Sequence, residues 1–304
     1  MKIYPNDAVE LIDMFPNEEA CLDYLEMIRW PHGYLCLRCS EKGALKLSRG
    51  LYRCQSCKYE GSVIVDTLFQ DTHKPLRLWF QAIWYVVSQK NGVSALGLQK
   101  ALGLGSYHTA WGWLHKLRRA MVRPGRDKLH GTIEINETMI GGEKSGKRGR
   151  GAEGKTLVLI AAEESQWGIG RIRMSPISDA SGEVLASTIQ QMVDVGSTIR
   201  TDGWAGYSGL SKLGYDHLPM SNHNVKDADV IEQAHLVAAL LKRWIIGTLH
   251  GSINHKNLPF YLDEFTFRFN RRTSNSRGKL FYRLIQQALE IDPVPAKLLA
   301  GVDR

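Results

Sequence analysis

The sequence has no long apolar run. A helix that crosses a membrane needs about 18 consecutive, mostly apolar residues, and no such stretch occurs. The N-terminal segment MKIYPNDAVELIDMF also lacks the apolar block of a secretory signal peptide. These absences argue against a membrane-spanning protein, and we expect a cytoplasmic protein with no membrane partner.

Cysteine is scarce, and acidic residues are fewer than basic ones. Only 5 cysteines occur among 304 residues, and 39 Lys and Arg against 31 Asp and Glu give a formal net charge of +8. This surplus favours an acidic polymer such as nucleic acid as a partner, although many soluble proteins are mildly basic. Apolar residues make up 43% of the chain, so a sizeable core can form, and the length suggests two domains with a small third module.

Four of the cysteines form two tight pairs, CLRC and CQSC. The segment 40–53 between the pairs is long enough for a hairpin that returns the second pair to the first. Four thiolates can then make a closed tetrahedral zinc site, which is structural rather than catalytic. The alternative is two unrelated cysteine pairs. We predict a zinc ribbon over residues 31–64, and its ligands are Cys36, Cys39, Cys54 and Cys57.

The remaining cysteine belongs to a short helical segment at the N-terminus. Residues 1–30 have the apolar spacing of two short helices, for which Asn6 and Asn17 are suitable N-caps. Cys21 lies on the apolar side of the second helix, so we interpret it as a core residue rather than a ligand.

A second helical region, residues 74–122, contains two short helices over 94–102 and 107–121. The turn between them, residues 103–106, carries glycine. Two such helices are typical of a helix-turn-helix, whose second helix enters the major groove of DNA. An ordinary helical hairpin inside a core is the alternative. The side chains that could face DNA are His108, Thr109, Trp113, Lys116 and Arg119.

The second half of the chain has the element order of a ribonuclease H-like α/β domain. Three strands are expected first, followed by a helix, a fourth strand and a late helix. In that architecture the first and fourth strands and the late helix bring ligands for two divalent cations to one sheet edge. The segments are 132–140, 155–164, 168–177, 182–193, 197–203 and 230–246.

Polar residues lie where this architecture needs them. Asp202 ends the fourth strand, although an Asp-Gly pair by itself is more often a simple turn. Alternation along the first strand puts Glu134 and Asn136 on one face. On the late helix, helical spacing puts Glu232, His235 and Lys242 on one face.

These stretches resemble a known family. The chain is similar, over nearly its full length, to bacterial insertion-sequence transposases (ISXO2-like) in which a zinc ribbon precedes a DDE-type, ribonuclease H-like domain. The branch it resembles most has an Asp-Asp-His-Lys signature. The stretches that carry the resemblance are RWPHGYLCLRC, YRCQSCKY, PLRLWFQAIW, TAWGWLHKLRRAM, IEINETMIGG, RTDGW, HLVAALLKRWIIGTLHG and YLDEFTFRFNRR.

The resemblance implies roles for four residues. Asp202 matches the second Asp, His235 the third ligand and Lys242 the trailing Lys, whereas Asn136 stands where the family has its first Asp. The implied activity is nicking at the element ends by water, followed by joining of the freed 3′-hydroxyl to target DNA. The implied cofactors are catalytic Mg²⁺ or Mn²⁺ besides structural Zn²⁺. The implied partners are double-stranded DNA of the element ends and of the target, with a homodimer or larger assembly on the DNA.

The departure at Asn136 affects the expected activity. An amide oxygen can bind a cation but carries no charge, so we expect weakened cation binding. Glu134 and Glu232 are possible compensating acids, although neither stands at the family's position. The alternative function is therefore a catalytically inactive DNA-binding regulator or inhibitor derived from a transposase. A ribonuclease H-like nuclease without strand transfer is a third hypothesis.

Two basic segments flank this region. Arg148 and Arg150 belong to a Gly- and Lys/Arg-rich loop after the first strand, and Arg271 and Arg272 belong to FRFNRR. Contact with DNA phosphates is the functional interpretation, and a solvated basic face is the alternative. The expected domains are a helical segment (1–30), the zinc ribbon (31–64), a helix-turn-helix-like DNA-binding region (74–122) and the ribonuclease H-like domain (130–290).

Overall fold

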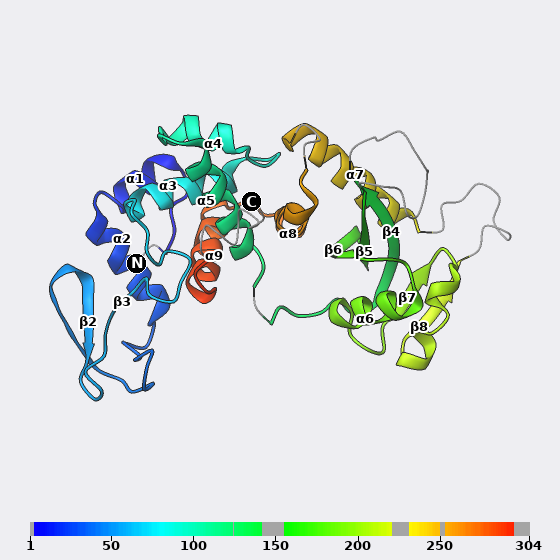
Figure 1. Ribbon diagram of the computed structural model, residues 1–304, viewed down its shortest axis with the longest axis horizontal. Coiled ribbons are helices and arrows are strands. Elements are labelled where there is room, and N and C mark those ends of the chain that lie inside the picture. The colour runs from blue at the N-terminus through cyan, green and yellow to red at the C-terminus, as the bar shows by residue number, and fades with distance from the viewer. Residues whose placement is uncertain (1–2, 124, 142–154, 221–230, 250–252, 295–304) are drawn as a thin grey trace. The chain divides into compact units, whose positions relative to one another are not determined.

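The computed structural model describes residues 3–123, 125–141, 155–220, 231–249 and 253–294. The chain forms two compact units, Met1–Pro124 with Ser274–Arg304 (unit 1) and Gly125–Thr273 (unit 2) (Figure 1). Within the described part of the chain, none of the helices has the length and apolar character that crossing a membrane requires.

Unit 1 combines a small sheet with a group of helices. The sheet has the order β1-β2-β3, and both strand pairs are antiparallel. The strands are β1 (Ala44–Lys46), β2 (Leu51–Cys54) and β3 (Glu60–Ser62). The α-helices are α1 (Ala8–Met14), α2 (Glu18–Arg29), α3 (Leu76–Ser88), α4 (Ala95–Leu102), α5 (Tyr107–Ala120) and α9 (Arg277–Glu290).

The first two helices begin at polar caps. Asn17 caps α2 as expected, because its side chain accepts a hydrogen bond from the backbone N–H of Ala20. Asn6 is not the cap of α1. Asp7 takes that position, and its carboxylate accepts from Val9 and Glu10. Cys21 is fully buried, which confirms its prediction as a core residue.

Aromatic side chains form much of the helical core of unit 1. The ring of Phe15 packs edge-on against Phe80 with centroids 4.8 Å apart, and Phe281 of α9 lies 5.7 Å from Phe80. The sequence alone assigns residues 274–290 to the sheet domain. Helix α9 instead packs on α3 in unit 1, because its apolar face completes this aromatic core.

Unit 2 is a mixed α/β domain built on a five-stranded sheet. The strand order is β6-β5-β4-β7-β8, with β4, β5 and β6 antiparallel and β4, β7 and β8 parallel. This order and these directions are those of a ribonuclease H-like sheet, as the sequence predicts. The strands are β4 (Thr132–Ile140), β5 (Thr156–Ser165), β6 (Gly168–Ile177), β7 (Thr198–Thr201) and β8 (Asp216–Pro219).

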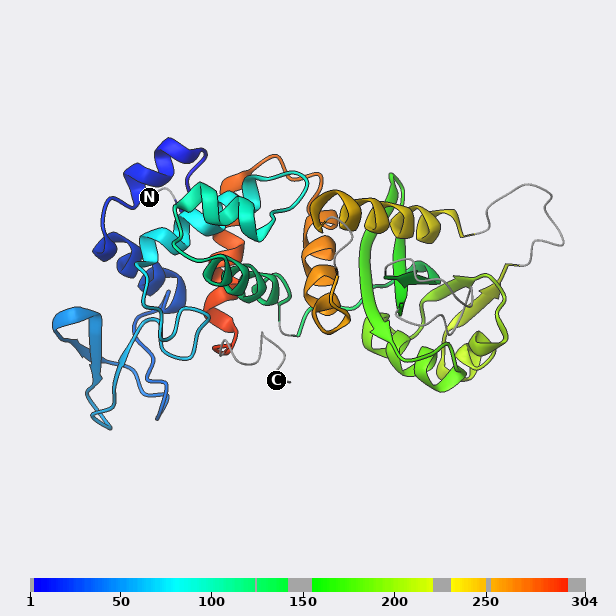
Figure 2. The same cartoon turned by 45° about the horizontal axis from the view of Figure 1, so that its top comes forward.

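Helices cover the two faces of this sheet. Helix α6 (Gly182–Met192) packs on one face through a core that includes Ile133 and Ile135. Helices α7 (Glu232–Leu249) and α8 (Leu258–Phe269) pack on the other face, and Figure 2 shows α7, drawn in gold, crossing over the strands of the sheet. Because strand side chains alternate, the even-numbered residues of β4 face α7.

A side chain from the end of α8 closes the open edge of β6. The Asn270 amide oxygen accepts from the backbone N–H of Ile172 at 2.7 Å, and its NH₂ group donates to the Ile172 carbonyl at 3.1 Å. The amide thus takes the place of a neighbouring strand. An edge strand that is paired in this way offers fewer groups for unwanted pairing with another chain.

Candidate functional site

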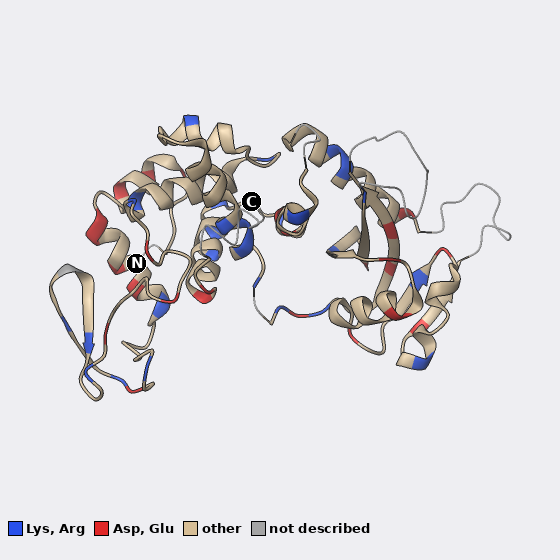
Figure 3. Ribbon diagram, in the orientation of Figure 1, with Lys and Arg blue, Asp and Glu red and all other residues tan. Residues whose placement is uncertain are grey.

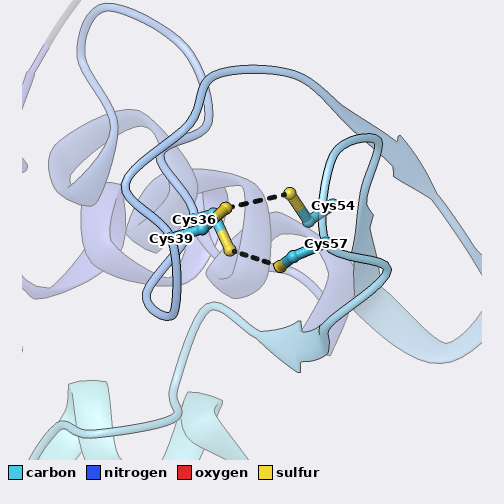
Figure 4. A group of neighbouring side chains, drawn as sticks. All are labelled: Cys36, Cys39, Cys54 and Cys57. Atoms are coloured by element: carbon cyan, nitrogen blue, oxygen red, sulfur yellow. Dashed lines mark hydrogen bonds between the residues drawn. The ribbon is translucent and has the colours of Figure 1, made fainter.

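The four paired cysteines converge at one point of unit 1 (Figure 4). Their sulfur atoms all lie within 4.8 Å of one another, with Cys36 Sγ 3.6 Å from Cys57 Sγ and Cys39 Sγ 3.7 Å from Cys54 Sγ. A tetrahedral zinc ion with Zn–S bonds of about 2.3 Å would hold sulfurs roughly 3.8 Å apart. The cluster therefore fits a structural zinc ion, as predicted.

The two cysteine pairs have the same local backbone. The N–H of Ser40 donates to the carbonyl of Cys36 at 2.9 Å, and the N–H of Lys58 donates to the carbonyl of Cys54 at 3.2 Å. Ser40 and Lys58 both have positive φ angles, of 58° and 63°. Each pair is thus a tight turn whose shape is set by residues close in sequence, so the motif could be recognised from spacing alone.

A second group of polar residues lies at the C-terminal end of β7. Strands β4 and β7 are parallel, and the pairs Ile133–Ile199 and Glu134–Arg200 fix their register. Asn136 and Asp202 each follow the last of these pairs by two residues. Alternation along β4 gives Asn136 the same face as Glu134. The first strand lies next to the fourth, as the sequence predicts, and a site shared by Asn136 and Asp202 stays a prediction.

The turn that carries Asp202 is held by its own neighbours. The Asp202 carboxylate accepts from the backbone N–H of Trp204 at 3.0 Å, and the Trp204 indole N–H donates to the carbonyl of Ala180 at 3.0 Å. A Cβ atom on Gly206 would lie 2.8 Å from the same carbonyl, so only glycine fits there. Asp202 is exposed, but its backbone is anchored against the segment that precedes α6.

Helix α7 presents its polar residues on one exposed flank. Glu232, His235 and Lys242 are all exposed, whereas the residues that pack on the sheet include Ala234 and Leu241. Figure 3 shows acidic residues along β4 and basic residues on α7. The helical spacing that the sequence predicts is thus present, with the polar flank beside the face that packs on the sheet.

Glu134 contacts this helix directly. Its carboxylate accepts a hydrogen bond of 3.0 Å from the backbone N–H of Ala234, the residue before His235. The side chain is only 5% exposed, and burial raises the pKa of the Glu134 carboxyl, although the N–H groups of Ala234 and Gln233 and the charge of Arg200 lower it. The sequence predicted Glu134 only as a compensating acid. No residue near Glu134 in the chain indicates that its partner is Ala234, in a helix one hundred residues later.

The helix-turn-helix elements form where the sequence predicts them. Ser94 caps α4, Gly103 ends it with a φ angle of 62°, and Ser106 caps α5. Trp113, however, does not face solvent. It is 7% exposed and stacks on Trp79 with ring centroids 3.8 Å apart, so its expected contact with DNA is wrong.

The other four predicted DNA contacts on α5 differ in exposure. His108 and Arg119 are exposed, and Thr109 and Lys116 are half-buried. Burial lowers the pKa of Lys116. The exposed His108 lies in the first turn of α5, the part of a recognition helix that reaches base edges.

The basic residues of FRFNRR have partners within unit 2. The Arg272 guanidinium donates to the carbonyls of Phe269 at 2.9 Å and Gly170 at 3.3 Å and also to Ile169, and it lies over the Phe269 ring. Arg271 lies 4.1 Å above the Phe267 ring. Arg272 therefore joins Asn270 in holding the β6 edge. Arg148 and Arg150 lie outside the described residues.

Two regions of the chain match models of known protein families. Residues 128–270 match the model of the ISXO2-like transposase domain, and residues 16–60 match that of the transposase zinc-ribbon domain. The sheet domain with its late helix is thus an ISXO2-like transposase domain, and the cysteine cluster with the helix before it is a transposase zinc ribbon.

A curated relative and a solved structure add to this comparison. The chain is 24% identical over 282 residues to an uncharacterized protein in transposable element ISH50 of Halobacterium salinarum, covering 84% of this chain and 92% of the relative. A crystal structure of a pre-cleavage Mos1 transpososome aligns with 73% of this chain and 79% of its own, at 11% identity and a TM-score of 0.29.

Proposed function

We propose that the chain is a transposase that binds the ends of its own insertion sequence as double-stranded DNA and catalyses cation-dependent nicking and strand transfer there. The chemistry would take place at the edge formed by Asn136, Asp202 and His235. The observation that supports this proposal is the parallel register of β4 and β7, whose last pair, Glu134 and Arg200, stands two residues before Asn136 and Asp202.

Two of the three proposed ligands at this edge offer the oxygen atoms that hard divalent cations prefer, and the third offers nitrogen. Asp202 supplies a carboxylate, Asn136 an amide oxygen and His235 an imidazole nitrogen, and Mn²⁺ tolerates the nitrogen better than Mg²⁺ does. Bound cations would stabilise the attacking and leaving oxygens of the phosphodiester. Asn136 leaves the set one negative charge short, so we propose that catalysis by this chain is impaired but not absent.

The remaining polar residues would handle DNA. Lys242 lies two turns after His235 on the exposed flank of α7, where its ammonium group would hold a phosphate near the cleaved bond. His108, Thr109, Lys116 and Arg119 would contact the element end from α5, and Arg271 the backbone. Two ends must meet for transposition, so we propose at least a dimer on DNA.

Cleavage and strand transfer with the full chain test this proposal. The substrate is duplex DNA copied from the sequence that flanks the gene, with Mn²⁺ as cation, and the proteins are the native chain, Asn136→Asp and Asp202→Asn. We expect slow nicking by the native chain, much faster nicking by Asn136→Asp and none by Asp202→Asn. If Asn136→Asp is inactive although it binds the duplex, the assignment of the site is wrong.

Asn136 also favours a second function. A chain that binds element ends but does not cut them would act as a regulator or inhibitor of related elements. This alternative gains support if the native chain binds the duplex as tightly as Asn136→Asp does and shows no nicking in Mn²⁺ even at long times. It loses support if both proteins nick at the same rate.

A further inference from the structure

The residue at the N-cap position of helix α7 has an apolar side chain. Its first residue is Glu232, and the residue before it is Ile231, whose buried aliphatic side chain cannot accept a hydrogen bond. The first backbone N–H groups of a helix have no partner inside the helix and usually bond to a Ser, Thr, Asp or Asn side chain at the N-cap. At this helix the sequence offers no such residue at the cap position.

The carboxylate of Glu134 supplies an acceptor at this end of the helix. Its 3.0 Å hydrogen bond comes from Ala234, the third residue of α7, which is one of the two positions that an N-cap side chain normally serves. The negative charge also lies at the positive end of the helix dipole. Glu134 therefore caps α7 from the neighbouring strand, across one hundred residues of sequence.

The location of this bond ties together the parts of the proposed site. Glu134 lies two residues before Asn136 on the same face of β4, and Ala234 directly precedes His235. One hydrogen bond thus sets the position of the first turn of α7 relative to the strand that carries Asn136. The buried Glu134 oxygen that accepts from the Ala234 N–H points toward the helix rather than toward a cation.

We propose that Glu134 is a positioning residue, which holds the His235 end of α7 against β4 and does not ligate the catalytic cations. This inference rests on the proposed function for its catalytic part and on the hydrogen bond to Ala234 for its structural part. Positioning requires only an acceptor oxygen, whereas a cation ligand at this position would also contribute its negative charge to the affinity. Glu134→Gln keeps the oxygen and removes the charge, and Glu134→Ala removes both.

Hydrogen exchange of the full-length chain tests the structural part. Exchange is followed in the peptide covering residues 232–238, for the native chain, Glu134→Gln, Glu134→Ala and the control Glu164→Gln, which removes a carboxylate of β5 that is ion-paired with Arg200. We expect Glu134→Ala to exchange roughly fivefold faster or more in this peptide, because a lost cap frees the first turn. Glu134→Gln and Glu164→Gln should stay close to native. Unchanged exchange in Glu134→Ala would overturn the proposal.

Cleavage tests the catalytic part, with each Glu134 variant combined with Asn136→Asp so that activity is measurable. We expect Glu134→Ala to lower the cleavage rate at saturating Mn²⁺ by about tenfold or more with unchanged DNA affinity, and Glu134→Gln to restore most of it at an unchanged half-saturating Mn²⁺ concentration. If Glu134→Gln instead needs about tenfold more Mn²⁺ for half-saturation while α7 stays protected from exchange, Glu134 is a cation ligand and the proposal is overturned. If Asn136→Asp alone does not cleave, the proposed function fails, and hydrogen exchange still decides the role of Glu134.

Discussion

The cysteine cluster of unit 1 and the polar edge of unit 2 are built in opposite ways. Each cysteine pair is shaped by a turn of its own, and the four sulfurs meet within 4.8 Å. The polar edge takes Asn136 from one strand, Asp202 from another and His235 from a helix, so their positions depend on strand register and on the seating of α7.

The two regions should therefore respond differently to substitution. The cysteine cluster has all four thiolate ligands for a zinc ion, and its geometry depends only on two turns and a hairpin. The proposed set at the edge has one carboxylate, that of Asp202, and the other acid on the same face of β4 as Asn136, Glu134, is bonded to α7. We therefore expect the first site to respond to loss of ligands alone, and the second to respond also to changes in the fold around it.

Loss of one cysteine should have the largest effect. Cys54→Ser leaves three thiolates, and structural zinc contributes on the order of 10 kcal/mol to the folding of small zinc domains. We expect the purified variant to hold less than one zinc per chain by elemental analysis, and the amides of β1 and β2 to lose their protection from exchange. The sheet of unit 2 should keep its protection.

Cys21→Ala is the matched control for that experiment. Cys21 is buried in α2, where burial raises the pKa of its thiol to about 12, so it is neither a thiolate nor a ligand. The control should keep one zinc per chain while losing some stability of the helical core. Full zinc content in Cys54→Ser would refute the four-thiolate site and remove the comparison.

Restoring a charge at the edge should have the next largest effect. In Asn136→Asp a second carboxylate lies beside Asp202, and a charge about 4 Å from a cation contributes on the order of 3 kcal/mol at an intermediate dielectric constant. We expect Mn²⁺ to bind roughly a hundredfold more tightly to the variant than to the native chain by calorimetry.

Ser211→Asp is the control for added charge, because Ser211 is exposed on the short helix Leu210–Leu213 of the same unit. It should leave Mn²⁺ affinity near that of the native chain. Equal affinities of all three proteins would mean that Asn136 and Asp202 do not share a cation, and that β4 and β7 end without a site.

Sequence reasoning succeeded where short-range chemistry decides the structure. The cysteine spacing, the bounds of β4, the cap of α2 and the turn at Gly103 are all set by residues near one another in the chain. The placement of Asp202 at the end of a strand that pairs with β4 followed from element order, because a ribonuclease H-like sheet has a fixed topology.

The contacts that sequence reasoning missed join residues far apart. Trp113 has the helical position of a solvent-facing residue, but Trp79 covers it. Arg272 stays a predicted phosphate contact, but the three backbone carbonyls that accept from its guanidinium were not predicted. In both cases the partners include residues of another element, and a polar or amphipathic side chain gives no local sign of them.

A smaller effect is expected from a change to the fold that touches neither site. Asn270→Ala removes both hydrogen bonds to Ile172 and leaves the edge of β6 unpaired there, which should cost about 1–3 kcal/mol of unfolding free energy for unit 2. The zinc content should not change. Denaturant unfolding followed by exchange of the sheet peptides measures the loss.

Asn257→Ala provides the control, since Asn257 stands before α8 and makes no capping hydrogen bond through its side chain. Its effect on unit 2 should be small. If the two variants lose the same stability, the Asn270 amide does not act as a strand partner, and the dependence of the edge site on distant contacts is weaker than we infer.

The smallest effect should be a change in the pH dependence of stability. Burial raises the pKa of the Glu134 carboxyl above its unfolded value, so the folded chain binds this proton more tightly than the unfolded chain does. The resulting stability is fully present below the unfolded pKa and is lost as pH rises through the folded pKa. Glu134→Gln removes this titration but keeps the acceptor for Ala234. Thermal unfolding across the acid range should therefore show native stability falling with pH relative to the variant, whereas a constant difference would mean that the N–H groups and Arg200 offset the burial of the charge.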